Sequence, residues 1–156
     1  MAAVILHDER IVLVRHRAHG ASYHLLPGGG VKVGESVGDA LAREVLEETG
    51  LIAHAVRPLF ISDAIAPDGR RHMVQLTFLA EATGGAITDR PLDPRVEGVE
   101  LADPADLSRY DLRPPMAEAL RLATESGYAG EARYLGALWT NGQAGSGPKG
   151  DPRTRG

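Results

Sequence analysis

The chain of 156 residues contains no cysteine, so it can form neither disulfide bonds nor thiolate metal sites, and it has no cysteine nucleophile. It also lacks any apolar run close to the roughly 20 residues that a membrane-spanning helix needs. The N-terminal sequence MAAVILHDER contains neither the basic region nor the long apolar segment of a secretory signal. These absences predict a cytoplasmic protein that does not bind membranes.

The chain has no excess of basic charge, because 17 Lys and Arg residues face 21 Asp and Glu residues and the formal net charge is −4. Proteins that bind extended nucleic acid rely on a basic face, so the composition argues against such a partner. Aromatic residues are scarce at 4%, which leaves few side chains to stack on a base once the core is filled.

The residues that are present suit one globular domain, since 43% are hydrophobic and 24% are charged over a length that fits a single core. We expect this domain to span residues 1–140. Residues 141–156 are rich in glycine, proline and polar residues and offer little surface to bury. We therefore expect a flexible C-terminal tail there.

Apolar runs bounded by turn-forming residues predict a set of β-strands. The expected strands cover residues 2–6, 11–17, 23–26, 51–64, 72–82 and 96–102. The first two form a hairpin, and the fourth and fifth form a longer one that closes at the turn sequence of residues 67–70. Residues 131–140 suit either a last strand or a short helix.

Helical signals mark residues 37–49 and 116–126. Ser36 can cap the start of the first helix, and Gly50 stands where a C-terminal glycine is expected. Strand runs combined with only two convincing helices predict the α/β class, with helices covering both faces of a mixed β-sheet in three layers.

The first predicted helix places Glu44, Glu47 and Glu48 on one face, because positions i, i+3 and i+4 of a helix are neighbours. Three like charges at this spacing repel one another and weaken an isolated helix. A divalent cation would remove the conflict, and ligands that are all oxygen suit Mg²⁺ or Mn²⁺. The alternative is a solvated acidic face that is balanced by Arg43.

The residues around these glutamates favour the metal. Gly29 is followed after five residues by Glu35 and after seven more by the sequence REVLEETGL, which ends at Leu51. This pattern resembles the Nudix box at every specified position from Gly29 to Leu51. The resemblance implies a Nudix-type α/β/α sandwich. It also implies hydrolysis of a nucleoside diphosphate linked to another moiety, by water attack on phosphorus with a divalent metal.

The same resemblance implies the site residues. Glu44, Glu47, Glu48 and the carbonyl of Gly28 are the candidate metal ligands, with Mg²⁺ as the expected ion and Mn²⁺ as a substitute. Arg43 can orient Glu47, one helical turn later, although an ordinary surface ion pair is the simpler interpretation.

The general base stays open between a box glutamate such as Glu44 and an acid from a distant segment, Glu97 or Glu100. We slightly favour Glu97, although a charge at the edge of a strand is the simpler interpretation for both distant acids. Glu35 resembles a residue that holds an outer water or a further ion, and a solvated loop acid is an equal alternative.

Substrate contacts are expected from the loop before the helix. Gly29 and Gly30 let the backbone approach phosphates where a Cβ would intrude. Lys32 adds a positive charge that can meet a phosphate, although a solvated lysine is the simpler interpretation. His24 stands where many relatives have an aromatic residue, so stacking on a base there is in doubt. The aromatic residues that remain as stacking candidates, mostly needed in the core, are Tyr23, Phe60, Phe78 and Tyr110.

The sequence leaves two candidate functions, which belong to different classes. The first is a pyrophosphohydrolase that acts on a small-molecule nucleoside diphosphate derivative, such as a nucleotide, nucleotide-sugar or dinucleotide. The second is a Nudix-fold sensor that binds a nucleotide without cleaving it. The complete box favours the enzyme, because sensors commonly lose a box glutamate. The sequence is compatible with a homodimer.

Overall fold

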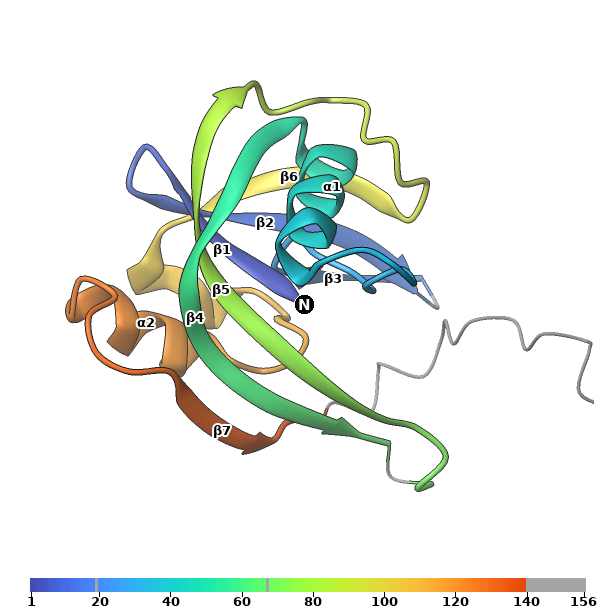
Figure 1. Ribbon diagram of the computed structural model, residues 1–156, viewed down its shortest axis with the longest axis vertical. Helices are drawn as coiled ribbons and strands as arrows, with labels where there is room; N and C mark the ends of the chain where they lie inside the picture. Colours follow the sequence, from blue (N-terminus) through green and yellow to red (C-terminus); the bar gives the residue numbers. More distant parts are fainter. Residues whose placement is uncertain (19, 67, 140–156) are drawn as a thin grey trace, which may run out of the picture.

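The computed structural model describes residues 1–18, 20–66 and 68–139, and Figure 1 shows the arrangement of their elements. The strands are β1 (Ala2–His7), β2 (Arg10–Ala18), β3 (Ala21–Leu25), β4 (Leu51–Ile65), β5 (His72–Gly85), β6 (Val96–Ala102) and β7 (Arg133–Ala137). The helices are α1 (Val37–Thr49), α2 (Ala117–Glu125) and a short 3₁₀ helix, η1 (Pro104–Arg109).

The strands form a mixed sheet, as predicted. In the described part of the chain their order is β3-β2-β1-β5-β4-β7, and β6 pairs with β2. Both expected hairpins are present, because β1 pairs antiparallel with β2 and β4 pairs antiparallel with β5. Strand β1 lies parallel to β5, and β7 lies parallel to β4. These parallel pairs join segments far apart in the sequence.

Local turn chemistry explains the hairpins. Asp8 and Glu9, between β1 and β2, both have positive φ, as the tight reversal there requires. The longer hairpin closes at Gly69, whose φ is 68° and whose amide donates to the carbonyl of Ala66 over 2.8 Å. Pro67, part of the predicted turn sequence, lies outside the described residues.

The two faces of the sheet carry separate cores, which confirms the three-layer prediction. Side chains alternate along β1, so Ala3 and Ile5 pack with Leu41 and Val45 of α1. On the opposite face, Ala2 and Val4 join the core that includes Leu120 of α2 and Leu107 of η1. Burial of α1 against the sheet fixes which of its faces remains available for chemistry.

Helix α1 has the bounds that the sequence predicts. Ser36 caps it by accepting a hydrogen bond from the Asp39 amide over 3.1 Å. Gly50 ends it in the left-handed region, at φ 78°, and donates to the Leu46 carbonyl over 3.0 Å.

The C-terminal part answers one open question. The segment that suited either a strand or a short helix forms the strand β7. The tail predicted for residues 141–156 lies outside the described residues and stays a prediction. Over the described ranges, no helix is long and apolar enough to cross a membrane.

Candidate active site

The loop that precedes α1 packs directly on the helix, and close contacts require glycine at two of its positions. The Gly28 amide donates to Oε2 of Glu48 over 2.8 Å. A Cβ at Gly28 would lie 2.3 Å from the carbonyl oxygen of Met1, and one at Gly29 would lie 2.5 Å from the carboxyl carbon of Glu44. Gly28 and Gly29 thus bring the backbone against the acidic face of the helix.

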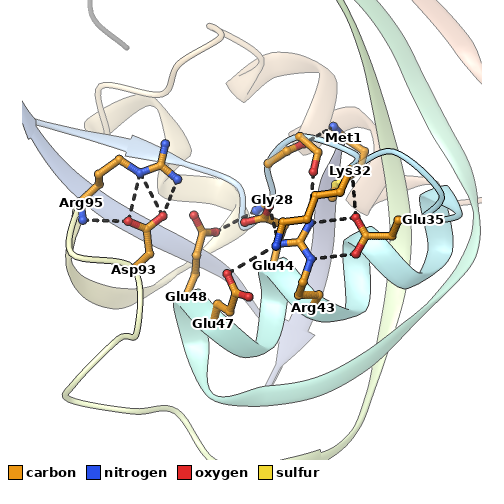
Figure 2. Close-up of polar contacts among 12 residues, drawn as sticks. Met1, Gly28, Lys32, Glu35, Arg43, Glu44, Glu47, Glu48, Asp93 and Arg95 are labelled. Atoms are coloured by element: carbon orange, nitrogen blue, oxygen red, sulfur yellow. Dashed lines mark hydrogen bonds and ion pairs between the residues drawn. The ribbon is translucent and has the colours of Figure 1, made fainter. Parts of the chain in front are cut away.

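The three predicted ligands lie on one face of α1, but they differ in burial (Figure 2). Glu48 is only 2% exposed and Glu44 only 7% exposed, whereas Glu47 is half-buried. Carboxylates are seldom buried without strong partners. The acidic face of this helix is therefore not the solvated surface that the alternative interpretation required.

Burial raises the pKa of the Glu48 carboxyl to about 8. The hydrogen bond from the Gly28 amide lowers the pKa, and the charge of Glu44 raises it. The protein partners of Glu48 therefore do not compensate for the burial of its charged form.

Arg43 links the loop to the helix (Figure 2). Its Nε and Nη2 donate to the two carboxylate oxygens of Glu35 over 2.7 and 3.0 Å, and its Nη1 donates to Oε1 of Glu44 over 2.7 Å. The predicted contact with Glu47 is longer, with 3.6 Å between Nη1 and Oε2. Arg43 therefore holds Glu35 and Glu44 more closely than the Glu47 that the sequence suggested.

Glu35 is committed to this pairing. The hydrogen bonds from Arg43 hold the pKa of its carboxyl down to about 2, with a smaller effect from the Lys32 amide. That amide donates to Oε2 of Glu35 over 3.0 Å. Lys32 itself is exposed and does not line the cavity described below, so its predicted contact with a phosphate gains no geometric support.

The donor set fits a hard divalent cation. Glu44, Glu47 and Glu48 offer only oxygen ligands. A bound Mg²⁺ or Mn²⁺ would stabilise the buried carboxylates of Glu44 and Glu48. Among the described residues, no three His, Asp or Glu side chains already converge as a ready metal cage. This is compatible with Mg²⁺, which usually takes few protein carboxylates and shares its other positions with water and substrate phosphate.

A fourth carboxylate, which sequence reasoning missed, lies beside these glutamates. Asp93, in the loop between β5 and β6, is held by Arg95, whose Nε lies 3.0 Å from both carboxylate oxygens. Figure 2 shows this pair next to Glu48. The charge of Asp93 raises the pKa of Glu48 and that of Arg95 lowers it. The loop is fixed to α1 because the Leu92 amide donates to the Glu47 carbonyl over 2.8 Å.

A cavity of about 530 Å³ opens between the loop before α1 and the strands β2, β3 and β6. This volume lies in the usual range of small-molecule sites. Among its lining residues are Glu48, the glycines at positions 28–30, Glu97, Tyr23, His16 and the arginines at 17, 71, 95 and 113. The acidic end of α1 therefore meets a wall that is rich in guanidinium groups.

The two distant acids differ in placement. Glu97 lines the cavity, and its Oε1 accepts from Nε of Arg17 over 2.7 Å. Glu100 does not line it and instead binds Nη1 of Arg15 over 2.8 Å and Nε2 of His24 over 3.1 Å. Of the two, Glu97 is thus the one that a bound substrate can reach.

The stacking candidates also separate. Phe60 and Phe78 pack in the two cores, and Tyr110 packs edge-on against His24 with ring centroids 5.0 Å apart. Tyr23 lines the cavity, and the Arg113 guanidinium carbon lies 4.3 Å from its ring centroid. His24 contacts Glu100 and Tyr110 instead, which agrees with the expectation that it does not stack on a base.

Known proteins are similar to this chain in sequence and in fold. The chain is 33% identical over 85 residues to the ADP-ribose pyrophosphatase of Methanocaldococcus jannaschii, covering 54% of this chain and 50% of that protein. It is 33% identical over 134 residues to the NAD-capped RNA hydrolase NudC of Escherichia coli, covering 83% of this chain and 48% of that protein. The chain therefore spans about half the length of these two relatives.

Solved structures agree with the observed architecture. A NUDIX hydrolase from Nitrosomonas europaea superposes with a TM-score of 0.69 at 26% identity, covering 81% of this chain and 86% of that one. A MutT NUDIX hydrolase from Burkholderia pseudomallei is 34% identical with a TM-score of 0.56, over 80% and 92% of the two chains. The family profile of the NUDIX domain matches residues 1–123. With its complete box, which runs from the loop before α1 to the start of β4, and with this architecture, the chain belongs to the Nudix family.

Proposed function

We propose that this chain is a divalent-metal-dependent pyrophosphohydrolase that cleaves the diphosphate linkage of a small nucleoside diphosphate derivative. One observation carries the proposal: Glu48, the most buried carboxylate of α1, lines a cavity whose other walls hold several arginines. A diphosphate needs cationic partners, and a buried acidic cluster needs a cation. A substrate bound together with Mg²⁺ would satisfy both requirements.

The metal would be held by Glu48, Glu44 and Glu47, with the Gly28 carbonyl as the further predicted ligand. When bound, it supplies electrophilic activation of the phosphoryl group and lowers the pKa of a water molecule. Neighbouring groups fix two of these ligands, because the Gly28 amide orients Glu48 and Arg43, itself held by Glu35, orients Glu44. Such fixing of ligands by their neighbours is typical of metal sites.

The remaining residues would act on the substrate. Arg17 and Arg95 lie in the cavity wall, where their guanidinium groups can bind phosphate oxygens. Water attacks one phosphorus, the bond from that phosphorus to the bridging oxygen breaks, and the second phosphate departs with that oxygen. We assign the proton of the attacking water to Glu97, because Glu97 lines the cavity. Glu44 remains the alternative base.

The substrate class is supported by the relatives, whose names include an ADP-ribose pyrophosphatase and a nucleoside triphosphatase. The cavity volume of about 530 Å³ suits a molecule of nucleotide size. A cytoplasmic location and a homodimeric state stay predictions.

A substrate panel tests the proposal. The protein is incubated with Mg²⁺ and with nucleotide-sugars, nucleoside triphosphates and dinucleoside polyphosphates, and products are identified by phosphorus NMR. We expect turnover of at least one class, with oxygen from labelled water on one phosphate product. Chelation of the metal should abolish turnover, and Mg²⁺ or Mn²⁺ should restore it. Binding of these compounds without cleavage would instead identify a sensor and overturn the proposed activity.

A further inference from the structure

His16 is a buried polar residue that the metal site does not explain. It lies on β2, is 6% exposed, and belongs to the lining of the 530 Å³ cavity. Its Nε2 is shielded from solvent and has no hydrogen-bond partner among the described residues. An unsatisfied buried polar atom costs about 1–3 kcal/mol and is rare in native proteins. A ligand that supplies the missing hydrogen bond would explain why the residue is there.

The surroundings of His16 favour a flat ligand. In the sheet, His16 pairs with Tyr23 on β3, and the two ring centroids are 5.6 Å apart. The guanidinium of Arg113 lies over the Tyr23 ring and is held by Asp111, with 2.6 Å between Nη2 and Oδ2. An imidazole, a phenol ring and a fixed guanidinium are planar groups that favour contact with another planar, conjugated group.

The electrostatics around His16 indicate that the ligand group it contacts is not a phosphate. Burial is the largest influence on the pKa of His16 and lowers it, and the charge of Arg95 lowers it further. Asp93 and Glu97 act in the opposite direction and do not reverse the shift. A neutral imidazole offers one hydrogen bond without a charge, which suits a nucleobase edge better than an anion. Arg17 and Arg95, which line the same cavity, are better suited to bind the phosphates.

We propose that His16 determines substrate specificity: on substrate binding its imidazole shifts so that Nε2, shielded in the free protein, forms a hydrogen bond to the edge of the substrate's nucleobase, beside the planar groups of Tyr23 and Arg113. This inference rests on the proposed function, since it places the nucleoside of that substrate at the end of the cavity formed by β2 and β3. His16 lies outside the Nudix box, so the box itself carries no information on this contact.

The test compares His16→Phe with His16→Gln and with the control His54→Phe. Phenylalanine keeps a planar ring but removes the hydrogen bond, and glutamine keeps a polar group of similar reach. His54 lies exposed on β4 and does not line the cavity, so the same substitution there controls for the change itself. Binding is measured with the four nucleoside α,β-methylene diphosphates in Mg²⁺, and kcat/KM with the four corresponding nucleoside diphosphate glucoses.

The wild-type protein should prefer one base. His16→Phe should weaken binding of that base about tenfold, as loss of one hydrogen bond predicts, and should level the preference among the four bases. His16→Gln should retain part of the preference, and His54→Phe should retain all of it. Ligand-free His16→Phe should melt no lower than wild type, because it removes an unsatisfied buried atom. A residue with a purely structural role would lower the melting temperature without changing the order of bases.

The outcomes separate this inference from the proposed function. Cleavage of all four glucose derivatives with no base preference, or an unchanged preference in His16→Phe, would overturn the role of His16 and leave the hydrolase intact. Base-selective binding that depends on His16, without cleavage of any compound, would support the role of His16 and overturn the hydrolase.

Discussion

The Gly28 amide donates a hydrogen bond of 2.8 Å to the carboxylate of Glu48, which is 2% exposed. This contact joins the first glycine of the loop to the most buried acid of α1. A buried carboxylate with one amide partner and an acidic neighbour gains more from a divalent cation than from solvent. The neighbours of Glu48 should therefore matter for activity through the cation that they help to hold.

Gly29→Ala should impair the site more than the fold. A Cβ there would lie 2.5 Å from the Glu44 carboxyl carbon, so the Glu44 side chain must move away from Arg43. We expect kcat/KM to fall at least tenfold while the melting temperature changes by a few degrees. At Gly30, where an added Cβ meets nothing within 4 Å, alanine should leave the melting temperature unchanged. Equal kcat/KM values for Gly29→Ala and wild type would contradict the contact.

Arg43 and Glu35 should act as one unit. Arg43→Gln removes the donor that holds Glu44, and Glu35→Gln breaks the double hydrogen bond that holds Arg43 in place. We expect losses of about 10–100-fold in kcat/KM, as is typical when a partner of a metal ligand is removed. The double variant should lose little more than the worse single variant, because coupled residues are not additive. Arg121→Gln, in an exposed ion pair on α2, should leave kcat/KM unchanged. Fully additive losses would show that the two residues act separately.

Leu41 should contribute strongly to stability through the core under α1. It is fully buried between the helix and the sheet, so Leu41→Ala should lower the free energy of unfolding by about 2–5 kcal/mol. Leu46 on the same helix is 46% exposed, and Leu46→Ala should cost less than about 1 kcal/mol. Urea denaturation measures both changes. Similar losses at the two positions would contradict the packing of α1.

Asp63 should titrate below the ordinary range of an aspartate. The hydrogen bond from the Tyr134 hydroxyl lowers the pKa of its carboxyl from the usual 3.8, with a smaller effect from His72. A lowered pKa means that this contact stabilises the fold above the ordinary value and that the stabilisation is lost as pH falls through the lowered value. Tyr134→Phe should therefore raise the pKa, as followed by carboxyl NMR titration. Tyr110→Phe is the control. An unchanged pKa of Asp63 in Tyr134→Phe would contradict this contact between β4 and β7.

The parts of the fold that the sequence predicts well depend on local signals. Helix α1 begins and ends where Ser36 and Gly50 place it, because caps act within one turn. The parallel pairing of β1 with β5 depends on contacts between residues 75 positions apart, such as Ala2 and Thr77, and no local pattern reports it. Only the structure could therefore place the strands in order.

The candidate site divides in the same way. Glu44, Glu47 and Glu48 share a face because helical spacing requires it, and the sequence predicts this directly. The pairing of Arg43 with Glu35 depends on the path of the loop. Asp93 and His16 come from segments without a motif, and only the assembled sheet brings them to the cavity or the acidic face. A short acidic and basic turn around Asp93 and Arg95 was the one available signal.

The most direct test of the metal site is a Mg²⁺ titration of kcat/KM for Glu48→Gln. Glutamine keeps the size and an oxygen that can accept from the Gly28 amide, but it removes the charge that holds a hard cation. We predict a loss of more than about 100-fold, beyond that expected for neighbours of a ligand, with an unchanged circular dichroism spectrum. Glu125→Gln on α2 should match wild type. Near-wild-type turnover of Glu48→Gln at low Mg²⁺ would contradict a metal site on this helix.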